Sequence, residues 1–332
     1  MTGEPDETVL RSRVPPTAAG HTLVGWLATR FRYLDERGWR EQITAGRVQR
    51  NGRGARPDEQ LATGDVVAYR PVHEEPRADL AIEVLADEPD FAVVFKPAHL
   101  VAHADGAFVK NTFFRVLERR YRDRGQPVRL ALAHRLDRET SGLLVVAKTT
   151  AGGRSLQQQF EAGTVAKEYR AIVHGVVGAD AFVADGAIGR DPDSAISIRR
   201  AVLPATAPGA RPASTTFRVD ERFAAHTLLT AVPHTGRTHQ IRVHLTHAGH
   251  PLVGDKLYGR SDAEYLDYVR FVKQGGDPAW DGRLPAGRQL LHAATLAFDD
   301  PRTGARLRFE APLPADMQAF LAGLRDGGSR GT

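Results

Sequence analysis

Two acidic side chains lie among basic ones just before an apolar run. The segment HRLDRETSGLLVVAKT, residues 134–149, places Asp137 and Glu139 on either side of Arg138, with Arg135 close by. The run LLVVA predicts a buried strand, so Asp137 stands where the chain leaves solvent for the core. An arginine partner would keep such a carboxylate ionised and oriented. Asp137 is the candidate reacting group, and an ion pair that only fixes a turn is the alternative.

Glu139 and the nearby histidines suggest other chemistry, which the rest of the sequence does not favour. Glu139 lies in the turn RETSG, where we expect its side chain to face water or cap the turn backbone. Paired with Asp137 it fits a two-carboxylate glycosidase, but aromatic residues make up only 7% of the chain and offer no platform for a sugar. Five histidines between residues 233 and 259 fit a metal-dependent hydrolase. Their neighbours are basic and the chain has no cysteine, so no metal is predicted.

The segment TGRTHQIRVHLTHAGH predicts a helix with an anion-binding end. The helix is expected from Thr238 to Ala248, with Thr238 as its cap. His239 and Arg242 are three residues apart and share a face, and Arg237 joins them at the entry. Free N–H groups lie at the same end. This end is expected to hold a phosphate or to reach the candidate carboxylate.

The elements that position these residues follow from apolar patterns. The expected strands are 81–85, 91–97, 142–148, 167–174, 215–220, 226–232, 290–298 and 305–310. The expected helices are 111–122, 154–162, 238–248 and 314–324. Long connections are expected at 178–213 and at 261–287, the second as a surface loop or lid. Because strands outnumber helices and form neighbouring hairpins, we predict an α+β fold whose mixed, mostly antiparallel central sheet is flanked by helices and loops.

A smaller α/β unit is expected before this fold. From His21 the pattern predicts two helices followed by a small sheet, with a hairpin turn at Asn51-Gly52. Between Arg30 and Arg56, eight arginines against three acidic residues favour phosphate binding over a solvated helix face. The predicted divisions are a flexible leader, 1–20; the small unit, 21–71; a linker, 72–80; the larger domain, 81–326; and a tail, 327–332.

Length and composition agree with a globular protein. The 332 residues suffice for two domains, and 42% hydrophobic residues are typical of a chain with a real core. The net charge of +5 supports a polyanionic partner without establishing one. Because no apolar stretch approaches membrane-spanning length, we expect a cytoplasmic protein without a membrane partner. A monomer is the default expectation, since the sequence does not determine the oligomeric state.

Four stretches, in order, resemble the RluA-type RNA pseudouridine synthases. They are HRLDRETSGLLVVAKT, KEYRAIVHG, TGRTHQIRVHLTHAGHPLVGDKLYG and LLHAATLAFDDPRTG. The resemblance extends over 81–325, and HRLD with TSG and TGRTHQIR is its most specific part. The earlier segment WREQITAGRVQRNGRGARPDEQLATGDVVAY resembles the small RNA-binding module named after a ribosomal small-subunit protein, at Ile43, Gly46, Val48, Asn51-Gly52 and Gly64-Asp65.

The resemblance implies an enzyme that converts uridine in RNA to its carbon-linked isomer without cofactor or metal. The family's essential aspartate corresponds to Asp137, which would attack the anomeric carbon or remove the neighbouring ribose proton. Tyr169 corresponds to the tyrosine that packs on the target base, Arg242 to the arginine that pairs with the aspartate, and Arg135 to the arginine that enters the RNA stack when the base flips out. Further RNA or supporting contacts are expected from Arg138, Arg237, His239 and Gln240.

Two departures and two alternatives accompany this reading. His99 in KPAH stands where the family commonly has Gly, which predicts a changed turn or RNA contact, and Asp300 in DDP replaces a His and predicts only a changed turn. By family analogy, the small module favours large-subunit ribosomal RNA over a tRNA stem-loop. A tRNA-directed synthase and a non-catalytic RNA-binding ribosome-assembly factor remain the alternatives.

Overall fold

A computed structural model describes residues 9–31, 34–70, 80–102, 111–126, 128–273, 276–277 and 283–328. The chain divides into two compact units, a smaller one within 9–70 that also takes in 111–116, and a larger one within 80–102 and 117–328. Most of the expected linker and tail lies outside the described residues. Among the described helices, none is long and apolar enough to cross a membrane.

In the small unit, two helices accompany a four-stranded sheet. Its elements are β1 (Leu10–Arg13), α1 (Leu23–Arg30), α2 (Glu36–Thr44), β2 (Val48–Arg50), β3 (Arg53–Gly54) and β4 (Val66–Tyr69), with strand order β1-β4-β2-β3. Trp39 and Tyr69 pack edge to face in its core. Asn51 and Gly52 both have positive φ, which is the conformation that a tight hairpin turn requires, so the predicted hairpin is confirmed.

The flexible leader expected at 1–20 is wrong for its second half. Strand β1 pairs antiparallel with β4, and Val14 and Ala18 are buried in the core of the small unit. The segment LRSR contains one apolar residue, so its local pattern carries no strand signal. Pairing with β4, a tertiary contact, decides its conformation.

After residue 80 the chain builds an eleven-stranded sheet. The elements are β5 (Glu83–Asp87), β6 (Phe91–Lys96), α3 (Phe113–Asp123), β7 (Ala131–Leu132), β8 (Ser141–Ala147), α4 (Thr150–Ala162), β9 (Ala166–His174), β10 (Ala181–Arg190), β11 (Arg200–Leu203), β12 (Arg211–Arg222), β13 (His226–Pro233), α5 (Gln240–His247), α6 (Asp262–Lys273), β14 (Leu291–Asp299), β15 (Arg306–Glu310) and α7 (Ala315–Gly328). The strand order is β11-β10-β12-β13-β9-β14-β8-β6-β5, with β15 beside β14 and β7 beside β8. Of the pairings among the described strands of this sheet, only β8 with β14 is parallel. The predicted mixed, mostly antiparallel α+β fold is therefore confirmed.

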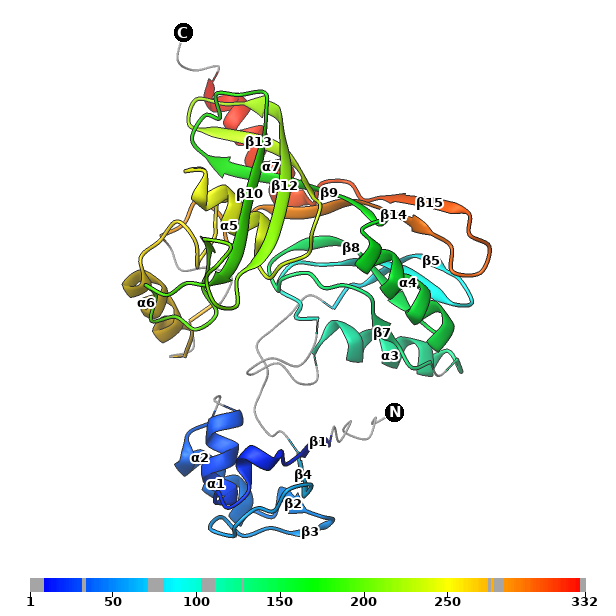
Figure 1. Cartoon of the computed structure of the whole chain (residues 1–332), viewed down its shortest axis with the longest axis vertical. Helices are drawn as coiled ribbons and strands as arrows, with labels where there is room; N and C mark the ends of the chain where they lie inside the picture. The colour runs from blue at the N-terminus through cyan, green and yellow to red at the C-terminus, as the bar shows by residue number, and fades with distance from the viewer. Residues whose placement is uncertain are drawn as a thin grey trace. The chain divides into compact units, whose positions relative to one another are not determined.

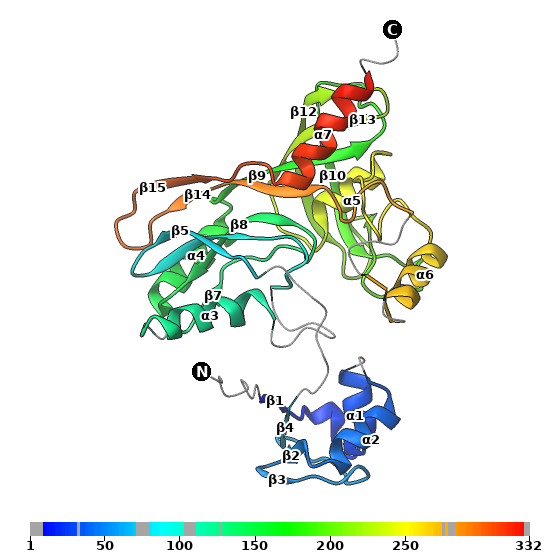
Figure 2. The same cartoon turned by 180° about the vertical axis from the view of Figure 1, so that it is seen from behind.

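Strands β9 and β14 connect the two halves of this sheet. Figures 1 and 2 show them extending between β10, β12 and β13, with α5 and α7, and the half that contains β5, β8 and α4. Leu156 of α4 packs with β6, β8 and β14, while Met317 of α7 packs with β9 and β13. A third cluster joins Val243 of α5 to β10 and β12. Each half therefore has its own core, to which β14 contributes in the half with α4 and β9 in the half with α7.

Two expected connections contain regular structure. Strands β10 and β11 lie within 178–213, and helix α6 lies within 261–287. The β10 sequence AFVADGAIGR is rich in Ala and Gly, which are uncommon in strands, so its local pattern does not predict a strand. Hydrogen bonding to β12 along one edge and β11 along the other supplies what its local sequence lacks.

The parallel contact between β8 and β14 depends on a glycine. Ser141 and Gly142 pair with His292 and Ala293. Gly142 has φ +115°, and a Cβ there would lie 2.2 Å from the carbonyl oxygen of Ala293. Only glycine adopts this conformation without strain and leaves room for the neighbouring strand.

We expect Gly142→Ala to lower the free energy of unfolding by at least about 2 kcal/mol, through backbone strain and overpacking. Gly153→Ala is the control, because Gly153 lies in helix α4 and a Cβ there would make an ordinary 3.5 Å contact with Ala147 of β8. That variant should unfold at the wild-type urea concentration or slightly above it. Equal stability of the two variants in urea unfolding would contradict the close approach of β8 and β14.

Candidate active site

Asp137 lies in the loop that leads from β7 into β8. Its carbonyl accepts a hydrogen bond from Thr140 N–H at 3.1 Å, which closes a turn immediately before the strand. Every residue of β8 is buried, so the predicted buried strand is confirmed. Upstream, His134 Nε2 accepts a hydrogen bond from Val145 N–H at 3.2 Å. The loop is thereby held by its own turn at one end and by a hydrogen bond to the buried strand β8 at the other.

Arg242 of α5 reaches the Asp137 carboxylate from 105 residues along the chain. Its Nη1 donates to Asp137 Oδ2 at 2.8 Å. The Arg242 side chain is 8% exposed and that of Asp137 is 22% exposed, so the ion pair is buried on the arginine side and open on the carboxylate side. This leaves part of the carboxylate free to meet a substrate.

A second carboxylate, Asp255, holds Arg242 in place. Arg242 Nε and Nη2 donate to its two oxygens at 2.7 and 2.8 Å, a bidentate pair. The Asp255 side chain is fully buried, and its Oδ1 also accepts hydrogen bonds from the N–H groups of Leu257 and Tyr258. The guanidinium lies 4.8 Å from the centre of the Tyr258 ring. Two hydrogen bonds and one ring contact thus fix the cation independently of Asp137.

These charges keep Asp137 ionised. Burial alone would raise the pKa of the carboxyl, but His239, which is protonated only at the low pH where Asp137 itself titrates, and the charge and hydrogen bond of Arg242 outweigh burial and lower the pKa to about 2. Burial lowers the pKa of His239 to about 4, so its imidazole is neutral at pH 7. Arg242 is therefore the cation that acts on Asp137 at neutral pH.

His239 occupies a strained position beside the carboxylate. Its φ is +59°, in the left-handed region that few residues other than glycine adopt. Its Nδ1 lies 2.8 Å from Tyr258 Oη, and its Nε2 lies 3.9 Å from Asp137 Oδ1. Helix α5 begins only at Gln240, and the Thr238 cap that the sequence predicted is wrong, because His239 itself is the N-cap residue. The left-handed turn aims the imidazole at Asp137.

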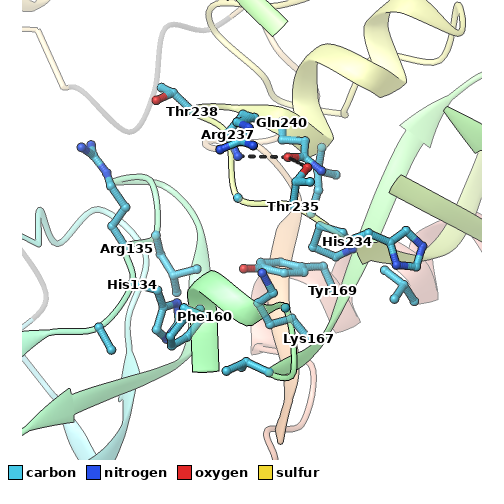
Figure 3. Close-up of a pocket in the computed structure, with 18 of the residues that line it drawn as sticks. His134, Arg135, Phe160, Lys167, Tyr169, His234, Thr235, Arg237, Thr238 and Gln240 are labelled. Atoms are coloured by element: carbon cyan, nitrogen blue, oxygen red, sulfur yellow. Dashed lines mark hydrogen bonds between the residues drawn. The ribbon is translucent and has the colours of Figure 1, made fainter. Parts of the chain in front are cut away.

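The carboxylate opens into a cleft of about 1060 Å³. Tyr169 of β9 lines it and is largely buried, and burial raises the pKa of its phenol. Figure 3 shows Tyr169 beside Lys167 on one wall, with Thr235 and Arg237 on the facing loop. Several nucleotide-sized groups fit in this volume.

Positive charge dominates the cleft lining. The charged residues that line it are Arg135, Lys167, Arg211, Arg237, Arg242, Asp137 and Glu161. Arg135 is exposed, and Figure 3 shows its guanidinium pointing away from His134. Arg237 Nε donates to the Pro212 carbonyl at 2.9 Å, which places it next to Arg211. Arg242 is already paired with two carboxylates of the protein. The other cations of the lining therefore favour a polyanionic ligand.

The side chains of two predicted RNA contacts, Arg138 and Gln240, are engaged by other groups of the protein. Arg138 is not among the cleft-lining residues and instead donates to Glu139 at 3.1 Å and to Tyr268 Oη at 3.4 Å. Gln240 lines the cleft but is buried, and its amide is engaged by Thr235, Arg237, Ser214 and Thr215. Both expectations came from the position of these residues within motifs, which does not show side-chain direction. The structure assigns both residues to support of the loops.

Glu139 is not the solvent-facing turn residue that the sequence suggested. It is buried and accepts hydrogen bonds from Lys256 Nζ at 2.6 Å and from Arg138. Arg288 Nη1 also donates to its carbonyl at 3.0 Å. A charged residue beside a buried strand is expected to face water, but the tertiary partner Lys256, 117 residues later, together with Arg138, makes burial favourable.

The sequence did not predict which residues support the Asp137 loop from the core side. Lys96 is fully buried, and its ammonium donates to the carbonyls of Pro97, Leu100 and Arg138 at 2.8 to 3.1 Å. Burial lowers its pKa to about 7. The KPA motif contained this lysine, and Asp255 and Tyr258 lie in GDKLYG, but the letters alone do not show that they turn inward.

His99, which stands where the family commonly has Gly, adopts a backbone conformation that suits glycine. His99 has φ +64°, the left-handed conformation that glycine adopts most readily. The backbone conformation is therefore one that glycine would favour.

Asp300 caps the turn between β14 and β15 by accepting from the N–H groups of Arg302 and Thr303, as expected for a change confined to a turn.

For metals, the part of the chain that the structure describes contains no group of three or more His, Cys, Asp or Glu side chains able to hold an ion. His239, the N-cap residue of α5, and His244, within α5, turn their rings to different partners, Tyr258 and Thr215. The chemistry available in the cleft is that of a carboxylate, a phenol and cations.

The neutral state of His239 predicts a pH dependence of stability. Because its folded-state pKa is about 4 against an ordinary value of 6.5, the unfolded chain binds this proton and the folded chain does not. The free energy of unfolding should therefore fall as pH decreases from 6.5 toward 4. His239→Asn removes the titrating group and keeps a residue that tolerates positive φ, so urea unfolding should depend less on pH in that window.

His247→Asn, an exposed histidine on the same helix, is the matched control. Its pH profile should follow that of the wild type. If His239→Asn and the wild type lose stability in parallel between pH 6.5 and 4, the buried neutral imidazole is not the cause.

Comparison with known proteins identifies the family. Residues 90–247 match the family model described as RNA pseudouridylate synthase. The chain is 34% identical to ribosomal large subunit pseudouridine synthase D of Xanthomonas campestris pv. campestris, over 99% of this chain and 97% of that protein. The protein of the same name from Vibrio parahaemolyticus is 33% identical, over 96% and 95%.

A solved structure agrees with these matches. Human RNA pseudouridylate synthase domain containing 4 is 26% identical, with a TM-score of 0.55, covering 73% of this chain and 92% of that one. The matches confirm the family that four stretches of the sequence resemble. The chain therefore belongs to the family of RNA pseudouridylate synthases.

Proposed function

We propose that the protein isomerises uridines of large-subunit ribosomal RNA to pseudouridine, with Asp137 as the reacting group. The observation that carries the proposal is the partly exposed Asp137 carboxylate, paired with Arg242 at 2.8 Å and lining a basic cleft. The choice of RNA rests on the relatives, which are named as acting on the large ribosomal subunit. It would act in the cytoplasm as a monomer.

The chemistry requires one bond to break and another to form on the same ribose. The C1′–N1 bond of uridine breaks, the base turns, and C1′ bonds to C5 of the ring, which then loses its proton. An ionised Asp137 would attack C1′ or remove the ribose proton beside it, and both routes need the carboxylate deprotonated. A pKa of about 2 meets that condition at every physiological pH.

The other cleft residues have roles that fit their positions. Tyr169 would pack on the target base, and its raised pKa keeps the phenol neutral beside Asp137. Arg135 is exposed at the cleft and would take the place of the flipped base in the RNA stack, where unstacking costs a few kcal/mol. Arg237 would contact phosphate. His239 would support the carboxylate from 3.9 Å away.

The small unit would add affinity for RNA. Among its arginines, Arg40 and Arg50 pair with acidic residues, which reduces the free charge that the sequence suggested. Arg53 and Arg56 remain exposed at and after the β2–β3 hairpin. An exposed basic hairpin on a compact helical unit is suited to phosphate contacts.

Complementation tests the proposed function. In a strain that lacks the gene, pseudouridines are mapped in ribosomal RNA and tRNA after expression of wild type, Asp137→Asn or Glu161→Gln. We expect wild type and Glu161→Gln to restore specific sites in large-subunit RNA, and Asp137→Asn to restore none, because only Asp137 can react. Glu161 is the other carboxylate that lines the cleft, so it controls for the charge change.

Three results would separate the alternatives. Restored sites in tRNA alone would replace ribosomal RNA by tRNA as the substrate. Restoration by Asp137→Asn would remove Asp137 from the chemistry. Rescue of growth by Asp137→Asn without any restored pseudouridine would favour an RNA-binding assembly factor.

A further inference from the structure

Lys167 is a cleft residue that the proposed reaction does not use. It lies on β9 two residues before Tyr169, so both side chains leave the same face of the strand. Figure 3 shows the two side chains next to each other on the cleft wall. Glu168, between them, turns to the opposite face and pairs with Arg218 and Arg308. Lys167 therefore faces the cleft, whereas its acidic neighbour Glu168 faces away from it.

The Lys167 ammonium has an aromatic contact but no anionic partner. Its Nζ lies 5.7 Å from the centre of the Phe160 ring. Among the described residues, no carboxylate lies within ion-pair distance of it and no hydrogen bond from its ammonium is found. A cation on an aromatic face gains less free energy than the desolvation of a charge costs. A partly buried ammonium of this kind is suited to an anion from outside the chain.

The groups around Lys167 leave its ammonium free to bind an anion. His134 stacks on Phe160, with ring centres 4.8 Å apart, and its Nε2 accepts a backbone N–H, which requires the neutral imidazole. Glu161, the acidic residue next to Phe160 in the chain, accepts a hydrogen bond from Gln157 at 2.8 Å. Asp137 is engaged by Arg242. The groups around Lys167 are therefore either neutral or already bound.

The position of Lys167 on the strand favours contact with a phosphate over contact with the target base. Two residues of a strand span about 7 Å, so the ammonium lies beside a base that covers Tyr169 rather than beneath it. A backbone phosphate of the same strand is the anion that reaches such a place. Arg211 and Arg237, also in the cleft lining, extend the basic surface.

We propose that Lys167 binds a backbone phosphate of the RNA strand adjacent to the target uridine. This inference rests on the proposed function, because it takes Tyr169 as the platform for the base. Lys167 is thus a residue that positions the RNA by charge, with Phe160 holding the lysine stem and ammonium in the orientation required.

Salt-dependent RNA binding tests the proposal. The probe is a fluorescent RNA hairpin that contains the uridine identified by mapping, and all proteins carry Asp137→Asn so that no turnover occurs. Lys167→Met keeps the aliphatic stem and removes the charge. We expect it to weaken binding about tenfold at low salt and to lower the slope of log Kd against log salt by about one. Lys167→Arg should retain the wild-type slope.

Arg325→Met is the matched control, since it removes one positive charge from α7, where Arg325 pairs with Glu221 outside the cleft lining. Its slope should equal that of the parent. An unchanged slope for Lys167→Met would overturn the proposal, and so would a lowered melting temperature as its only effect. A loss of kcat with unchanged affinity in the active enzyme would instead assign Lys167 to the base.

Failure of the proposed function has a different signature. If mapping finds no pseudouridine made by the wild-type protein, the isomerase proposal fails, and the same titration with polyuridylate as probe still measures whether Lys167 contributes a phosphate contact. A normal isomerase whose Lys167→Met variant keeps the full salt slope would sink the Lys167 inference alone.

Discussion

The bidentate ion pair between Arg242 and the buried Asp255 is the contact on which the candidate site depends. A guanidinium buried without partners costs several kcal/mol, so its position follows the carboxylate that neutralises it. Asp255 is fixed by backbone N–H groups of Leu257 and Tyr258, and it leaves one Arg242 nitrogen, Nη1, for Asp137. The reacting carboxylate is therefore held by a cation that is itself held by a deeper carboxylate.

The sheet brings these residues together from distant parts of the chain. Asp137 enters from the loop before β8, Tyr169 from β9 and Arg242 from α5 beyond β13. Strand β14 lies between β8 and β9, and the close parallel contact at Gly142 sets the spacing between the Asp137 loop and the strand of Tyr169. Lys96 and the Glu139–Lys256 pair fix the loop from the core side. Rigid strands and buried charges together make the site a property of the whole larger unit.

The sequence predicted the parts of this site whose signals are local, and it missed those that depend on tertiary contact. The LLVVA run fixed a buried strand after Asp137, and motif resemblance paired Asp137 with Arg242, which no spacing rule connects. Glu139 was misjudged because its partner Lys256 is far along the chain. Strands β1 and β10 carry weak patterns and form because neighbouring strands bond to them. Gln240 and Arg138 occupy motif positions that suggested RNA, but side-chain direction follows from packing that the letters do not record.

The most direct measurement of the central claim is the rate of pseudouridine formation by Asp255→Asn under single-turnover conditions. The substitution retains the side-chain shape and removes the charge that orients Arg242. With the folded state verified by circular dichroism and RNA affinity unchanged, we expect the rate to fall about a hundredfold, because Asp137 loses its fixed geometry. A folded Asp255→Asn enzyme that reacts at the wild-type rate would contradict the account.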